Sequence, residues 1–226
     1  PGQSDVGGVL EDPIARRSVG HQGGMILRSP PRSRVLRTFV AIELSSELRA
    51  AIQAALAEMR RALPKVPLRW SPLENIHVTL KFLGATPESD VPKILAALKE
   101  NLSNISCFTL VPKGVGTFPP NKAPRVVWIG LEESAGRLAE IAEAVERALN
   151  PLGFPPENRP FSPHLTIARS PRSGLGDGSS KVLDTLSKLA FPPFPAFAVD
   201  KITLMESRLQ PKHSLYIPIG YIPLLN

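Results

Sequence analysis

The chain has 226 residues, of which 42% are hydrophobic and 21% are charged, and this balance excludes a disordered chain. Its length allows one large domain or two small ones. The formal net charge of +7 favours an anionic partner, which can be nucleic acid, a phosphorylated metabolite or a membrane surface.

The cysteine content and the length of the apolar runs indicate the cellular compartment of the protein. Cys107 is the only cysteine in the sequence, so an intramolecular disulfide and a cysteine-based zinc cluster are both excluded. It lies in the strand-like run ISCFTLV, where a buried core thiol is the commoner outcome. No stretch approaches the ~18 to 20 apolar residues that span a bilayer. We therefore expect a cytoplasmic protein with no membrane partner.

The first 34 residues differ in composition from the rest of the chain. Residues 1–34 lack periodicity and mix Gly, Ser, Pro and Arg. We predict a disordered extension there, with a basic RNA-contacting arm as the alternative. From residue 37 the run RTFVAIEL is β-branched and aromatic, as in a buried strand. Residues 35–226 are accordingly predicted to form a single domain.

Helices and strands alternate through the first half. Residues 45–63 predict an amphipathic helix with Ser45 or Ser46 as its N-cap. Thr86 and Pro87 predict the N-cap and first turn of a second helix, which runs to residue 102. Strands are predicted around Trp70, over 76–83 with Gly84 as its end, and over 107–118 and 124–131.

The second half repeats this order of parts. Helices are predicted over 134–150 and near 180–190, and strands over 163–169, 197–207 and 214–224. Because hairpin-like pieces are interspersed, the pattern favours an α+β domain of two similar lobes over a doubly wound parallel sheet.

Two His-x-Thr tripeptides stand 87 residues apart, one in each predicted lobe. They pair His77 with Thr79 and His164 with Thr166. Side chains alternate along a strand, so each histidine shares a face with its threonine, and their Cα atoms lie about 6.6 Å apart. An imidazole and a hydroxyl can then converge on one phosphate. Two imidazoles can hold opposite protonation states near neutral pH and act as acid and base without a metal.

A structural role and a zinc site are the alternatives to catalysis for these two histidines. A lone histidine in a strand is most often structural, but two copies at equivalent positions favour chemistry. A zinc site lacks the third and fourth ligands that proteins use. His213, in the turn QPKHS, is more typical of a solvated loop than of a third catalytic group. Arg169 faces the core if its strand is regular, whereas a bend brings it to the phosphate, so we keep it as a candidate substrate-binding residue.

Five runs in order carry a resemblance to a known family. RTFVAIEL, LRWSPLENIHVTLKFLG, FPPNKAPRVVWIGL, RPFSPHLTIAR and LMESRLQPKHSLYIPI closely resemble the bacterial and archaeal RNA 2′,3′-cyclic phosphodiesterases. These proteins, also called 2′-5′ RNA ligases, belong to the 2H phosphoesterase superfamily. The resemblance covers about residues 36–226. It implies two pseudo-symmetric lobes whose antiparallel sheets face a central groove, with helices outside.

The resemblance also implies an activity and residue roles. The expected reaction is hydrolysis of an RNA 2′,3′-cyclic phosphate end to a 2′-phosphomonoester, with no metal or cofactor. His77 would donate a proton to the leaving 3′-oxygen, and His164 would accept one from water. Thr79 and Thr166 would bind phosphate oxygens, and Tyr216 would lie near the groove or in the core. A ribose 5′-hydroxyl in place of water would give 2′-5′ RNA ligation.

We expect a monomer that binds RNA ends carrying a cyclic phosphate, and two alternatives stay open. One is an enzyme that opens small cyclic nucleotides, such as a cyclic phosphate derived from ADP-ribose. The other is a non-catalytic RNA-end-binding module, although binding alone does not require two titrating groups. Aromatic side chains at the groove would favour RNA, and Trp70 and Phe118 are candidates that can equally belong to the core.

Overall fold

The computed structural model describes residues 34–120, 122–176, 178–211 and 213–226. The predicted extension of residues 1–34 lies outside these residues except for Arg34, so its disorder stays a prediction. Within the described ranges, no helix is both long enough and apolar enough to cross a membrane.

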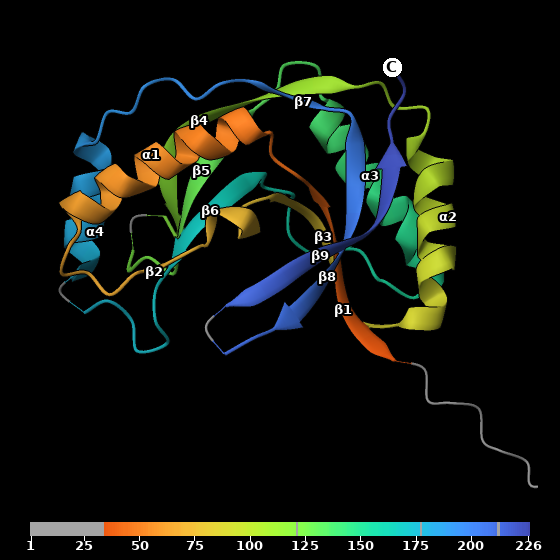
Figure 1. The fold of residues 1–226 in the computed structure, drawn as a ribbon, viewed down its shortest axis with the longest axis horizontal. Coiled ribbons are helices and arrows are strands. Elements are labelled where there is room, and N and C mark those ends of the chain that lie inside the picture. The colour runs from red at the N-terminus through yellow and green to blue at the C-terminus, as the bar shows by residue number, and fades with distance from the viewer. Residues whose placement is uncertain (1–33, 121, 177, 212) are drawn as a thin grey trace, which may run out of the picture. The chain divides into compact units, whose positions relative to one another are not determined.

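The strands of the described residues form one antiparallel sheet (Figure 1). They are β1 (Val35–Ile42), β2 (Arg69–Trp70), β3 (Val78–Pro87), β4 (Phe108–Phe118), β5 (Val126–Glu132), β6 (His164–Arg169), β7 (Phe197–Val199), β8 (Lys201–Leu209) and β9 (Ser214–Pro223). Their order along the sheet is β7-β4-β5-β6-β3-β1-β8-β9, and β2 pairs with the last two residues of β6.

Four helices of the described residues pack against this sheet, and their buried apolar side chains form the hydrophobic core together with those of the strands. They are α1 (Ser46–Ala62), α2 (Val91–Leu102), α3 (Arg137–Leu149) and α4 (Gly178–Lys188), with 3₁₀ turns η1 (Leu73–Asn75), η2 (Glu88–Asp90) and η3 (Asn150–Leu152). Figure 1 shows α1 and α4 on the side of β4, β5 and β6, and α2 and α3 on the side of β8 and β9. The Ser45 side chain accepts a hydrogen bond from the Leu48 amide at 3.2 Å, which confirms the predicted N-cap of α1.

The sheet consists of two matching halves. One half runs β6-β5-β4-β7 and the other β3-β1-β8-β9, so the two His-x-Thr strands are neighbours at the centre. They meet through the single registered pair Val78 and Leu165. The predicted α+β fold of two pseudo-symmetric halves is confirmed, and the two predicted sheets are joined into one. The predicted division of the lobes along the chain is wrong, because β8 and β9 lie in the half of β3, and β4 and β5 lie in the half of β6.

The predicted start of the second helix is wrong. Thr86 and Pro87 belong to the end of β3, where they pair with the first residues of β1. The Thr86 hydroxyl is buried and lies 2.8 Å from the hydroxyl of Thr38, so it joins two strands instead of capping a helix. Gly84, at φ +73°, does not end the strand but allows an irregularity within it. The helix begins only after η2, at Val91.

The predicted strand over 197–207 is also wrong as a single element. It divides at Asp200 into β7, which pairs with β4, and β8, which pairs with β1 and β9. A continuous apolar run carries no signal for this change of partner. Cys107 packs against the core but is only partly buried.

Candidate active site

A β-bulge follows the threonine of each His-x-Thr tripeptide. In β3 the pairing with β1 skips Leu80, and in β6 the pairing with β5 skips Ile167. An extra residue on one strand changes which face the following residues occupy. Beyond the two bulges, Phe82 and Arg169 therefore line the same cavity as the two threonines.

The bulge in β6 decides the position of Arg169. Ile167 and Ala168 are both fully buried, and the pairing of β6 with β5 skips Ile167, so the alternation of faces breaks at this point. Arg169 then turns outward and is exposed. The regular-strand expectation that Arg169 faces the core is wrong, and its placement at the cavity follows from the bend.

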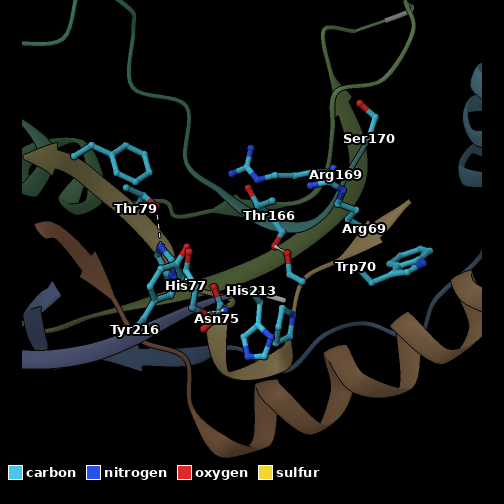
Figure 2. A pocket seen from close by; sticks show the side chains of 14 residues that line it. Arg69, Trp70, Asn75, His77, Thr79, Thr166, Arg169, Ser170, His213 and Tyr216 are labelled. Carbon is cyan, nitrogen blue, oxygen red and sulfur yellow. Dashed lines mark hydrogen bonds between the residues drawn. The ribbon is translucent and has the colours of Figure 1, made fainter. Parts of the chain in front are cut away.

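A cavity of ≈280 Å³ opens beside His77, and we call it the His77 cavity (Figure 2). Of the six candidate site residues, the five that line it are His77, Thr79, Thr166, Arg169 and Tyr216. Figure 2 shows Arg169 extending from β6 across the cavity toward the side where Thr79 and His77 lie. The candidates thus make up five of the fourteen residues that line this cavity.

His164 lines a second cavity of ≈600 Å³, which we call the His164 cavity. Thr79 and Phe82 line both cavities, so the two spaces adjoin at these side chains. Trp70 lines the His77 cavity and Phe118 lines the His164 cavity, so each cavity has one of the two aromatic residues that we expected to stack on bases.

Both histidines are oriented by the same backbone contact. Nδ1 of His77 lies 2.9 Å from the carbonyl oxygen of Asn75, and Nδ1 of His164 lies 2.7 Å from that of Ser162. A carbonyl oxygen only accepts, so each Nδ1 carries the proton and donates it. In the neutral ring Nε2 is then the atom able to take up a proton. Nε2 of His77 lies 3.0 Å from the Thr79 hydroxyl.

The surroundings of His77 disfavour its charged form. Its ring packs against Phe39, at 4.8 Å between centroids, and against Tyr216, at 5.2 Å, and these two rings also contact each other. Burial lowers the pKa of His77 to about 4, and the charges of Arg49, Arg169 and His164 act in the same direction against the opposing hydrogen bond to the backbone. His77 is therefore neutral at pH 7 in the free protein. The Tyr216 ring, edge-on to the imidazole, belongs to both the cavity wall and this packing.

The segment between β2 and His77 joins the two motifs. The Ser71 hydroxyl donates to the carbonyl of Thr166 at 3.0 Å, and the Asn75 amide donates to the carbonyl of Ser214 at 2.6 Å. Arg49 of α1 donates to the carbonyl of Leu73 at 2.9 Å. These bonds tie the turn before His77 to β6, to α1 and to β9.

Several cavity residues were not identified from the sequence. Arg69 lines the His77 cavity because β2 pairs it with Arg169 across the strands. Phe82 lines it because of the bulge after Thr79. His213 is exposed, as predicted for a loop residue, but it also lies at this cavity. Each depends on strand pairing, which the sequence pattern does not specify.

The side chains around the two cavities offer no cluster of metal ligands. Within the described ranges, no three His, Cys, Asp or Glu side chains lie together in an arrangement that could hold a metal ion. The chemistry available to the residues present is proton transfer by imidazole, hydrogen bonding by hydroxyls and charge from guanidinium groups.

Sequence comparisons point to one family. The family model of the 2′-5′ RNA ligase superfamily matches residues 48–211. An RNA 2′,3′-cyclic phosphodiesterase of Archaeoglobus fulgidus is 33% identical, over 80% of this chain and 96% of its own length. One of Aquifex aeolicus is 31% identical, over 81% of this chain and 94% of its own. A third, of Geobacillus stearothermophilus, is 33% identical over 83% of this chain, and the match spans 57% of its own length.

Solved structures share the fold. The crystal structure of TT0787 of Thermus thermophilus matches with a TM-score of 0.65 and 28% identity, over 83% of this chain and 97% of that one. The structure of E. coli LigT complexed with 3′-AMP matches with a TM-score of 0.67 and 25% identity, over 85% of this chain and all of the other. The family model and these relatives show that the chain belongs to the 2′-5′ RNA ligase superfamily.

Proposed function

We propose that this protein hydrolyses RNA 2′,3′-cyclic phosphate ends to 2′-phosphomonoesters, with His77 and His164 as its acid and base. The observation that carries the proposal is the matching pair of Nδ1 hydrogen bonds, which leave Nε2 of both rings for proton transfer. The naming of relatives from Archaeoglobus and Aquifex as RNA 2′,3′-cyclic phosphodiesterases supports the reaction class.

The hydroxyls and cations of the His77 cavity suit a phosphate. Thr79 and Thr166 donate to its non-bridging oxygens, and Arg169 offsets its negative charge. The Thr79 hydroxyl, now 3.0 Å from Nε2 of His77, turns to the phosphate when substrate binds. The buried Ser170 hydroxyl has no hydrogen-bond partner in the described part of the chain and lines the same cavity, so it can serve as a further donor.

The reaction then proceeds by in-line displacement at phosphorus. Nε2 of His164 accepts a proton as water attacks, and a new P–O bond forms. The bond from phosphorus to the ribose 3′-oxygen breaks, and Nε2 of His77 donates the proton that this oxygen needs. The phosphate stays on the 2′-oxygen.

The low pKa of His77 makes its protonation depend on the substrate. In the free protein, burial holds the pKa of His77 at about 4, which disfavours a proton donor. A phosphate anion within a few ångströms favours the imidazolium, because an opposite charge stabilises the charged form. Substrate binding thus raises the pKa of His77 and charges it where the leaving oxygen will form.

Binding features favour RNA over a small cyclic nucleotide. Trp70 and Phe118 supply aromatic faces on either side of Thr79, and the net charge of +7 suits a polyanion. A substrate that extends into both cavities uses both faces.

The proposal is tested with a short RNA that ends in 2′,3′-cyclic phosphate, incubated with the protein in EDTA. We expect a 2′-phosphate product. A 3′-phosphate product would place the broken bond at the 2′-oxygen and contradict the roles given above. Binding of the RNA without turnover would support the end-binding module instead.

A further inference from the structure

Arg69 and Arg169 line the His77 cavity without an acidic partner (Figure 2). They are paired across β2 and β6, so two guanidinium groups come from directly opposed strand positions. Neither forms an ion pair with any residue that the structure describes, and none of the described residues that line this cavity is Asp or Glu. Like charges at opposed positions destabilise a sheet. Bound anions would offset this repulsion.

The positive charge continues from Arg69 to the ring of Trp70. The guanidinium carbon of Arg60, on α1, lies 5.6 Å from the centroid of this ring. Arg60 is exposed, lies outside the cavity lining, and forms no ion pair with any residue in the described part of the chain. A guanidinium that lies over an aromatic face keeps N–H groups at its edge for an anion. Arg69 and Arg60 thus both offer donors next to Trp70.

The cyclic phosphate accounts for only part of this charge. A 2′,3′-cyclic phosphodiester carries a single negative charge. In the proposed reaction, Thr79 and Thr166 contact its oxygens and Arg169 offsets its charge. Arg69 and Arg60 are therefore left for a second anion.

The proposed reaction places the terminal nucleoside near these two arginines. His77 protonates the leaving 3′-oxygen, and this oxygen belongs to the ribose that carries the cyclic phosphate. That ribose therefore lies on the His77 side of phosphorus, opposite the attacking water. Trp70 lines the cavity on the same side and offers its ring to the base. In RNA, the next phosphate is attached to the 5′-oxygen of this ribose.

We propose that Arg69 and Arg60 bind the phosphate on the 5′-oxygen of the terminal nucleoside, beside the base that stacks on Trp70. This inference rests on the proposed phosphodiesterase function. It makes this phosphate a specificity determinant, because an RNA end has it and a nucleoside 2′,3′-cyclic phosphate does not. A free 5′-phosphate on a mononucleotide offers the same chemistry as the diester of an RNA strand, so the test includes both.

The test compares substrates that share the cyclic phosphate and differ at the 5′-oxygen. Adenosine 2′,3′-cyclic phosphate has no 5′-phosphate, its 5′-phosphorylated form has a monoester there, and ApA 2′,3′-cyclic phosphate has a diester. The readout is the kcat/KM of each phosphate-bearing substrate divided by that of adenosine 2′,3′-cyclic phosphate. We expect both ratios to be about fivefold or more, since an exposed ion pair contributes up to about fivefold in affinity. Both should fall as the salt concentration rises, because Arg69 and Arg60 are exposed.

Two variants remove the proposed contacts. Arg69→Met and Arg60→Met are each expected to lower both ratios about threefold to fivefold. Each ratio compares substrates on the same enzyme, so it does not depend on how much of a variant folds. Arg61→Met is the matched control on α1, because this neighbour pairs with Glu58, and it should keep the wild-type ratios. Arg169→Met should slow all the substrates in proportion, since Arg169 serves the cyclic phosphate.

The outcomes separate this inference from the function on which it rests. Equal kcat/KM for all the substrates in the wild type would overturn the 5′-phosphate site and leave the hydrolytic function intact. A gain for ApA 2′,3′-cyclic phosphate alone would assign the contact to its second nucleoside and contradict the phosphate site. Wild-type ratios in both Arg69→Met and Arg60→Met would remove these residues from it. Absence of turnover with every substrate would overturn the phosphodiesterase function, and this inference with it.

Discussion

The two His-x-Thr strands have the same backbone geometry but different surroundings. Each threonine is followed by a bulge, and each histidine donates from Nδ1 to the carbonyl two residues before it. Yet His77 packs against both Phe39 and Tyr216, whereas the ring contact of His164 in the described chain is with Phe118. Main-chain bonds therefore fix where both rings point, and the burial of His77 lowers the pKa of that ring.

The bulges also carry different residues in the two halves. The second residue after each threonine is buried, and it is Lys81 in β3 and Ala168 in β6. Lys81 is 1% exposed, and its Nζ donates to Glu146 of α3 at 2.5 Å and to the carbonyl of Pro155 at 2.8 Å. The half that contains β3 is thus held to α3 and to the loop at Pro155 by hydrogen bonds of a buried lysine. At the equivalent position of β6, Ala168 makes apolar contacts alone.

The largest expected effect is the loss of turnover when either imidazole is removed. We expect His77→Ala and His164→Ala each to lower turnover about 10²- to 10⁴-fold, the contribution of a positioned acid or base. His213→Ala, at the exposed edge of the same cavity, serves as the comparison and should lose much less. Turnover is measured on a dinucleotide cyclic phosphate, and a near-wild-type rate in either variant would remove that histidine from the mechanism.

Lys81→Met tests how much the buried ion pair with Glu146 stabilises the half of the sheet that contains β3. This change leaves the Glu146 carboxylate and the Pro155 carbonyl without their donor, and removal of one partner of a buried pair costs about 3–5 kcal/mol of unfolding free energy. Because Glu146 is 26% exposed, we expect about 3 kcal/mol.

Lys113→Met is the matched control for Lys81→Met. It breaks the exposed pair with Glu132, whose side chains are 66% and 60% exposed, and should cost less than about 1 kcal/mol. Urea unfolding measures both variants. Equal costs would show that the buried pair gives the first half no special stability.

The burial of His77 predicts a pH dependence of stability. The pKa of His77 is about 4 in the folded chain, whereas an unperturbed histidine has a pKa of 6.5. Between these two values the unfolded state binds the proton and the folded state does not. The contribution of His77 to stability is therefore complete above pH 6.5 and falls as the pH drops toward 4, by at most about 3 kcal/mol.

His77→Gln removes this titration and isolates its contribution. Between about pH 7 and pH 4.5, urea unfolding should show a smaller loss of stability in the variant than in the wild type, while the carboxylates contribute equally to both. Parallel losses in the two proteins would mean that His77 is protonated as easily in the fold as outside it.

The smallest expected effect concerns the residue that the second bulge turns outward. Arg169→Met removes a charge from the phosphate site and should lower kcat/KM about 10- to 100-fold, the value of a hydrogen bond to a charged group. It should also raise the pKa of His77, because Arg169 helps to lower it. An NMR titration of the His77 ring measures this shift, and an unchanged midpoint would place the Arg169 charge too far away to matter.

The sequence predicted the parts of this fold that follow from local patterns. The alternation of side chains placed His77 with Thr79 and His164 with Thr166, and apolar periodicity identified α1 and most strands. It did not predict the bulges, because a bulge appears only when a strand is compared with its partner. For the same reason the outward turn of Arg169, the buried hydroxyl of Thr86 and the break at Asp200 could not be inferred.

The two halves of the sheet are joined at its centre by the single registered pair of Val78 in β3 and Leu165 in β6. Each half holds one histidine and one threonine, so neither half alone has both an acid and a base. The half that holds His77 is made of the first and last strands of the chain, β1, β3, β8 and β9, and the half that holds His164 is made of the strands between them. The pair of histidines is therefore complete only when both ends of the domain have joined one sheet.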